Sequence, residues 1–134
     1  MASSYNTDYS LQSTNNKSRR KINKNCLQLN LQQSRAATSN LTPVILQFTV
    51  DIAFVQKPYT ILNNVAGFPK SFRIFAHGNI RKRSAILVNN NEDDVTAITQ
   101  VSHEDVLLTE IRYEGHAFYG ASLYLNINRD IERN

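Results

Sequence analysis

The chain has 134 residues, a formal net charge of +4 and a single cysteine, Cys26. This length allows one domain, and 41% hydrophobic residues with only 4 glycines and 3 prolines exclude collagen-like and fully disordered classes. One cysteine excludes an internal disulfide framework and a thiolate zinc cluster, and it favours a reducing compartment. The 15 basic residues against 11 acidic ones favour a polyanionic partner only mildly, because salt screens so small a field.

No apolar run approaches the roughly 20 residues that cross a bilayer, and the first residues lack the charged and apolar regions of a signal peptide. We therefore expect an intracellular protein of the nucleus or cytoplasm, not a secreted one, and we expect no membrane partner.

Residues 1 to 24 are rich in Ser, Asn, Gln and Thr and end in a basic cluster over residues 17–21. So few apolar groups offset little of the entropy lost on ordering, which predicts a disordered polar and basic tail over 1–24 and a folded domain over 25–134. The basic cluster is then a solvated leader, and the alternative is a role in nuclear import or nucleic-acid binding.

The ordered part begins with a strand, a helix and a second strand. A leucine at every second position predicts the first strand over 26–31. Ser34 is a suitable N-cap for a helix of about four turns, which Pro43 should kink or split. The apolar run 51–56 predicts the next strand, ended by Lys57 and a proline. A unit of this length implies two parallel strands joined by a crossover helix.

A loop over 59–70 is followed by purely extended patterns. Glu114 and Gly115 predict a hairpin turn, and residues 89–94 predict a polar turn between earlier strands. The fold class is therefore α/β of the α+β kind, with a mixed, mostly antiparallel sheet and one crossover helix. The acidic start of a helix at 130–134 lacks the length to complete one. Five further strands are predicted, over 72–76, 84–88, 95–99, 105–113 and 117–124.

Self-sufficient catalytic motifs are missing from the sequence, which has no Gly-rich phosphate loop, no His-Glu-x-x-His and no Gly-x-Ser-x-Gly, and no small-molecule cofactor is indicated. The three histidines fall in different predicted loops, as surface histidines do. The acidic run 92–94 is expected to be solvated, because converging ligands need a fixed cage. The basic run of Arg81, Lys82 and Arg83 is either a charged strand edge or a set of phosphate contacts.

Four short segments carry more information in their order than any one of them does alone. They are Leu-Gln-Leu-Asn-Leu at 27–31, Ser-Arg-Ala-Ala at 34–37, Asp-Ile-Ala-Phe-Val-Gln-Lys-Pro-Tyr at 51–59 and Ala-Ser-Leu-Tyr-Leu at 121–125. In this order they resemble the endonuclease/exonuclease/phosphatase superfamily, and within it the apurinic-endonuclease-like domain of insect non-LTR retrotransposons. The resemblance covers roughly residues 26–133 and implies part of a two-layer or four-layer sandwich of mixed sheets and helices.

The resemblance also implies site residues. Asn30 would orient a ligand or the phosphate, and Tyr124 would donate a hydrogen bond to the scissile phosphate, so both are catalytic candidates. Without the resemblance, Asn30 is a turn-forming amide and Tyr124 a half-buried strand aromatic. Where the family has its principal magnesium-binding glutamate, this chain has Lys57. An ammonium removes an oxygen ligand and repels the ion, by a swing on the order of 10 kcal/mol, so we expect no metal there.

The chain also stops before the family's Asp-x-Asn strand and closing Asp-His pair, which predicts a truncated domain without catalysis and with an unpaired sheet edge. The leading hypothesis is thus an inactive fragment of a retrotransposon-type endonuclease domain, whose intact relatives nick DNA by magnesium-dependent hydrolysis. The alternative is a non-catalytic module, derived from such a domain, that holds nucleic acid through Lys57, Arg81, Lys82, Arg83 and the tail. A third hypothesis is a mixed-sheet domain with unrelated ligand chemistry, which the absence of parallel pairing between 26–31 and 51–56 would favour.

Overall fold

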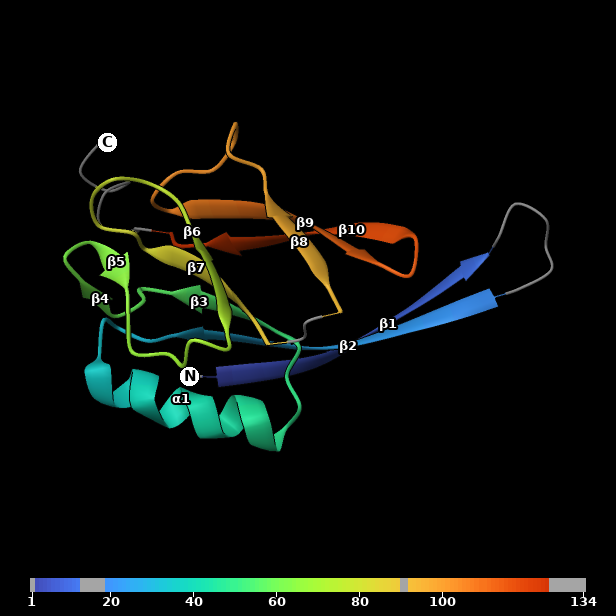
Figure 1. Ribbon diagram of the computed structural model, residues 1–134, viewed down its shortest axis with the longest axis horizontal. Coiled ribbons are helices and arrows are strands. Elements are labelled where there is room, and N and C mark those ends of the chain that lie inside the picture. Colours follow the sequence, from blue (N-terminus) through green and yellow to red (C-terminus); the bar gives the residue numbers. More distant parts are fainter. Residues whose placement is uncertain (1, 13–18, 90–91, 126–134) are drawn as a thin grey trace.

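The computed structural model of the chain describes residues 2–12, 19–89 and 92–125. Within these ranges, one helix and two larger sheets form three stacked layers (Figure 1). The helix α1 (Arg35–Gln47) packs on one face of a five-stranded sheet. The strands of that sheet are, in spatial order, β1 (Ala2–Gln12), β2 (Arg19–Asn30), β3 (Ile52–Gln56), β7 (Ser84–Val88) and β6 (Arg73–Ala76).

The opposite face of the five-stranded sheet packs on a three-stranded antiparallel sheet of β10 (His116–Leu123), β9 (Val106–Tyr113) and β8 (Asp94–Ala97). A two-stranded hairpin of β4 (Thr60–Ile61) and β5 (Asn64–Val65) stands apart from both sheets. All five residues of β7 are buried, because this strand has the helix layer on one side and the second sheet on the other.

The predicted crossover unit is present. β2 and β3 run parallel, with Asn30 opposite Gln56, and α1 connects them. The Ser34 side chain caps the helix by accepting a hydrogen bond from the Ala37 N–H at 3.1 Å. Pro43 lies inside α1 and does not split it. A proline in a helix removes a main-chain donor, and the burial of neighbouring residues against the sheet outweighs that loss here.

The five later strands also lie where the sequence predicts them, within one or two residues at each end. Glu114 and Gly115 form the predicted turn, with φ angles of 51° and 79°, as a two-residue hairpin loop requires. The loop over 59–70 contains the β4–β5 hairpin, which is too short to show a periodicity. The polar turn predicted over 89–94 includes residues 90 and 91, which lie outside the described residues, and the strands that flank it, β7 and β8, belong to different sheets. The predicted helix start at 130–134 lies outside the described residues.

The amino-terminal region differs from its prediction. Residues 2–12 form β1 and residues 19–24 form the first half of β2, paired antiparallel from Ala2 opposite Leu29 to Gln12 opposite Arg19. Main-chain hydrogen bonds pair such strands without needing apolar side chains, so a polar composition gives no sign of them. Figure 1 shows the far half of this hairpin extending past the other strands. The division of the chain into a tail and a domain near residue 24 stays a prediction.

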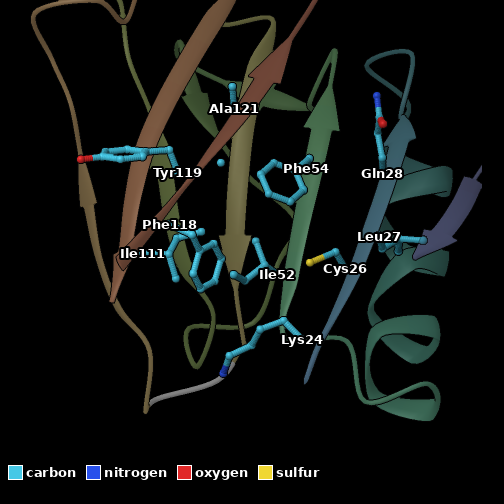
Figure 2. A pocket seen from close by; sticks show the side chains of 11 residues that line it. Lys24, Cys26, Leu27, Gln28, Ile52, Phe54, Ile111, Phe118, Tyr119 and Ala121 are labelled. Carbon is cyan, nitrogen blue, oxygen red and sulfur yellow. The ribbon is translucent and has the colours of Figure 1, made fainter. Parts of the chain in front are cut away.

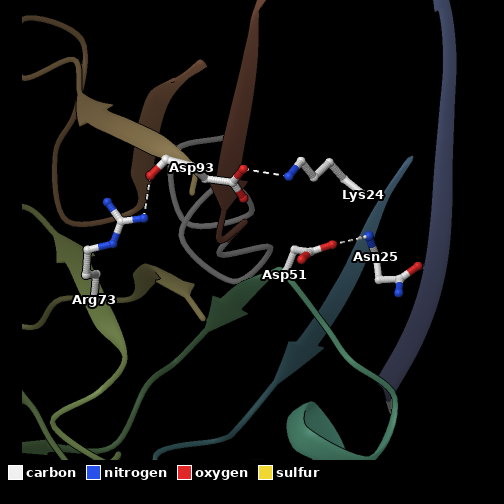
Figure 3. Close-up of polar contacts among 5 residues, drawn as sticks. All are labelled: Lys24, Asn25, Asp51, Arg73 and Asp93. Atoms are coloured by element: carbon white, nitrogen blue, oxygen red, sulfur yellow. Dashed lines mark hydrogen bonds and ion pairs between the residues drawn. The ribbon is translucent and has the colours of Figure 1, made fainter. Parts of the chain in front are cut away.

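A buried ion pair joins β2 to the start of the second sheet. Lys24 Nζ donates a hydrogen bond to Asp93 Oδ1 at 2.6 Å (Figure 3). The same atom also lies 3.6 Å from the centroid of the Tyr113 ring. The two residues are only 2% and 1% exposed. The sequence prediction that 92–94 is solvated is therefore wrong for Asp93, because a lysine 69 residues away compensates its charge.

Further polar contacts hold the same region. Arg73 Nη2 donates a hydrogen bond to the main-chain oxygen of Asp93, and the N–H of Asn25 donates to Asp51 Oδ2 at 2.9 Å (Figure 3). These polar contacts thus link the five-stranded sheet to the start of the three-stranded sheet. Among the described residues, no helix is both long and apolar enough to cross a membrane.

Replacing Lys24 by methionine should destabilise the protein strongly, because Asp93 then stays buried without its compensating charge. We expect the free energy of unfolding, measured by urea denaturation, to fall by about 3 to 5 kcal/mol. The double variant Lys24→Met/Asp93→Leu removes both charges and should recover most of that decrease. A single variant within about 1 kcal/mol of the parent would contradict a structural role for the pair.

The same variants should differ in pH dependence. Burial raises the pKa of the Asp93 carboxyl above its usual range, and Lys24 opposes the shift. In Lys24→Met that opposition is gone, so the folded-state pKa rises further. A pKa raised on folding contributes stability that is present at low pH and is lost as the pH rises through the folded-state pKa. Between pH 8 and pH 4, the free energy of unfolding of Lys24→Met should therefore increase relative to that of the double variant as the pH falls. A constant difference between them would contradict this mechanism.

Candidate functional site

The carboxyl ends of β2, β3 and β10 gather at one end of the molecule, together with the connection that enters β7 (Figure 1). Lys57 follows β3, Arg83 precedes β7, and Tyr124 follows β10. The Lys57 Nζ atom lies 5.3 Å from the centroid of the Tyr124 ring, and the Arg83 Cζ atom lies 5.7 Å from it. Two cations therefore face one aromatic ring, an arrangement that ring electrons favour. We call Lys57, Arg83, Asp105 and Tyr124 the Tyr124 site.

Asp105 connects the parts of the Tyr124 site. Its carboxylate accepts an ion-pair hydrogen bond from Arg83 Nε. Its main-chain oxygen accepts hydrogen bonds from the Tyr124 N–H at 2.8 Å and from the Ser84 hydroxyl at 2.7 Å. One residue before β9 thus holds both the Arg83 guanidinium and the main chain of Tyr124, and nothing local in the sequence signals this.

Lys57 is fixed through its backbone. Its N–H donates a hydrogen bond to the Arg83 carbonyl at 2.8 Å, and its own carbonyl accepts one from the Gln33 N–H at 2.9 Å. The φ angle of Lys57 is +47°, in the left-handed region that L-residues other than Gly, Asn and Asp seldom adopt. Backbone strain of this kind persists only where neighbouring contacts hold it, and it is enriched at functional sites.

Asn30 lies at the same edge of the five-stranded sheet as Lys57, and its side chain stabilises a turn there. Its side-chain oxygen accepts a hydrogen bond from the Gln32 N–H at 2.8 Å, which closes the turn after β2. This is the turn-forming amide that we gave as its alternative role. The site role of Asn30, like that of Tyr124, stays a prediction.

A buried polar link joins the two sheets directly below the Tyr124 site. Gln56 Nε2 donates a hydrogen bond to Ser122 Oγ at 3.1 Å, and Ser122 Oγ donates one to the Val55 carbonyl at 3.0 Å. Gln56 immediately precedes Lys57, and Ser122 lies two residues before Tyr124. The link therefore sets the spacing between the strand ends that carry the site.

The basic run of Arg81, Lys82 and Arg83 lies in the connection between β6 and β7 and not on a strand edge, because β7 is an inner strand of its sheet. Arg83 belongs to the Tyr124 site, Lys82 is half-buried, and Arg81 is exposed with a φ angle of +53°. Their contact with nucleic acid remains a prediction. Of the basic tail cluster, residues 17 and 18 lie outside the described residues.

The structure contains cavities that the sequence did not predict, and two of them contain residues discussed above. His77 and His103, expected in unrelated loops, line one polar cavity of about 370 Å³ together with Glu104. An apolar cavity of about 230 Å³ lies between the sheets beside β10, the edge strand of its sheet in the described part of the chain, with Cys26, Phe54 and Phe118 in its wall (Figure 2). Cys26 faces this cavity because alternate residues of β2 point away from the helix.

Magnesium, which the family resemblance implies for intact relatives, does not fit the described residues. Within residues 24–89 and 92–125, no three His, Cys, Asp or Glu side chains lie close enough to share a metal ion. At the Tyr124 site a divalent cation would meet two cationic side chains, and the carboxylate of Asp105 is bonded to Arg83. Hard cations need several oxygen ligands and are repelled by such charges.

No family model matches the chain, and no curated protein matches it. Among solved structures, the chain is similar to the endonuclease domain of TRAS1, a telomere-specific non-LTR retrotransposon, with a TM-score of 0.67 and 24% sequence identity. That match covers 81% of this chain and 47% of the TRAS1 chain. A second match is an endonuclease/exonuclease/phosphatase family protein from Leptotrichia buccalis C-1013-b, with a TM-score of 0.48 and 14% identity, over 81% of this chain and 62% of that one.

This chain therefore spans about half the length of the TRAS1 endonuclease domain that it matches. The parallel pairing of residues 26–30 with 52–56, whose absence would have favoured an unrelated domain, is present. The chain has the fold of a retrotransposon endonuclease domain over the matched region, as the four ordered segments predict.

Proposed function

We propose that this chain is a nuclease-like domain that binds the phosphate backbone of DNA at the Tyr124 site and does not hydrolyse it. The observation that carries the proposal is the pair of cations, Lys57 and Arg83, facing Tyr124 at the strand ends. This observation favours the binding hypothesis over an inactive remnant, because Asp105 holds the Arg83 guanidinium, backbone hydrogen bonds hold Lys57, and both side chains are half-buried.

The chemistry of the site suits a phosphodiester. Arg83 carries five N–H donors, of which Asp105 engages Nε, and a guanidinium matches the geometry of phosphate oxygens. Lys57 adds a second positive charge near the same ring, and the Tyr124 hydroxyl can donate a hydrogen bond. The likeness to a retrotransposon endonuclease domain supports DNA as the polyanion.

The same residues argue against hydrolysis. The resemblance aligns Lys57 with the glutamate that binds the metal in the family, so the charge at that position is inverted. An ammonium can neutralise a phosphate directly, but it neither coordinates a divalent ion nor supplies an oxygen ligand. We therefore derive no metal-assisted step for this chain, and its role is to bind.

Purified chain incubated with supercoiled plasmid and Mg²⁺ should leave the plasmid intact, because the site lacks a place for the metal. Agarose electrophoresis of nicked and supercoiled forms measures the outcome. The Tyr124→Phe variant is the control, since it removes the hydroxyl and little else. Nicking by the parent that is abolished in Tyr124→Phe would overturn the non-hydrolytic proposal.

Binding of a fluorescent duplex, followed by anisotropy over a series of salt concentrations, should be weakened by Lys57→Ala and by Arg83→Ala. Removing one cation that neutralises a phosphate should lower the slope of log K against log salt by about 0.9. Arg112→Ala is the matched control, because that side chain is 65% exposed on β9 and forms an ion pair with Glu110. Equal effects of all three variants would show a non-specific charge effect and contradict the assignment of the site.

A further inference from the structure

The β4–β5 hairpin presents two apolar side chains to solvent at its tip. The turn residues are Leu62 and Asn63, with φ angles of 51° and 66°. Leu62 is 90% exposed, and the preceding Ile61 is 53% exposed. Within residues 24–89 and 92–125, no other large apolar residue is as exposed as Leu62.

Leucine is a poor choice for this backbone. Two-residue hairpin turns with positive φ at both positions favour Asn, Asp and Gly, because other side chains crowd the main chain there. Asn63 meets this preference and Leu62 does not. An apolar side chain is unfavourable in solvent, and a leucine is unfavourable at positive φ. Neither burial nor turn geometry therefore accounts for a leucine at the tip.

The base of the hairpin is held firmly. The Ala66 N–H donates a hydrogen bond to the Tyr59 carbonyl at 3.0 Å, and Val65 and Phe68 pack against the core between α1 and the sheet. Gly67 lies so close to the helix that a Cβ atom there would come within 2.7 Å of the Thr38 Cγ2 atom. A hairpin anchored this way presents its tip in a fixed direction.

The charges in the chain segment that carries the hairpin suit a polyanion. Between residues 57 and 72 the charged side chains are Lys57 and Lys70, with no Asp or Glu. Two exposed amides, Asn63 and Asn64, stand beside Leu62. The hairpin lies at the same end of the molecule as the end of β3, which leads into Lys57 (Figure 1). A nucleic acid held by the cations would therefore pass near the hairpin.

We propose that Leu62 is a wedge that enters a groove of duplex DNA bound at the Tyr124 site and partly unstacks one base step. Proteins that insert apolar side chains between base pairs combine them with amides and cations that contact the groove, and a rigid support is needed because unstacking costs free energy. The inference rests on the proposed function and adds to it the form of the DNA, a duplex opened at a flexible pyrimidine–purine step.

The test uses the purified chain and a duplex of about 20 base pairs with 2-aminopurine, whose fluorescence rises on unstacking, at a central T-A step. The parent should raise that fluorescence on binding. Leu62→Asn should abolish the rise and lower affinity for this duplex roughly tenfold. Because asparagine accepts positive φ, the same variant should melt about 2 to 5 °C higher than the parent. A leucine kept only for structure would not give this opposition between stability and binding.

Leu46→Asn is the matched control, since Leu46 is 58% exposed on α1 and should leave both the fluorescence rise and the affinity unchanged. If the parent binds DNA with the expected salt dependence and Leu62→Asn keeps the fluorescence rise, the wedge is overturned while the proposed function stands. If the parent binds no DNA, both fail. If Leu62→Asn changes only the oligomeric state in light scattering, the tip is a self-association contact and the wedge is overturned.

Discussion

The parallel pairing of β2 with β3 is the constraint from which the candidate site follows. Parallel neighbours must end at the same edge of a sheet, so Asn30 and Gln56 lie side by side and Lys57 lies beside the turn after β2. The pairing needs a crossover, which the capped helix α1 supplies and whose apolar face then fills one core. β7 pairs antiparallel to β3, and this places Arg83 at the same edge. The register of the paired strands thus determines where the site residues lie.

Much of this arrangement could be predicted because its causes are local. Leucines at alternate positions mark β2, a serine before the apolar helical face marks the cap, and Glu114 with Gly115 marks the last turn. The order of four short segments predicted the fold as well, although none of them is specific alone. Local signals of this kind agree with the global fold, as sequences that specify one structure require.

Contacts between residues far apart in the chain could not be predicted. Lys24 belongs by composition to a polar tail, and Asp93 to a solvated acidic run, and only their approach across 69 residues makes burial of either one possible. Asp105 likewise shows no local pattern, since its importance lies in three hydrogen bonds to Arg83, Ser84 and Tyr124. The local composition of a sequence predicts the average exposure of a segment. Whether one charged side chain is buried depends on a particular partner of opposite charge, which can lie far away in the sequence.

Lys57 shows why the fold and the activity of such a domain are separable. Its backbone adopts a left-handed φ and is hydrogen-bonded to Gln33 and Arg83, so the fold holds the main chain at this position. A carboxylate there would be an oxygen ligand for a cation. In the proposed function, the ammonium of Lys57 would attract the phosphate itself, and that attraction would stabilise the bound ground state. Interactions that hold substrate and transition state equally do not accelerate a reaction. In the proposed function, the inverted charge at Lys57 therefore favours holding DNA over cutting it on the same fold.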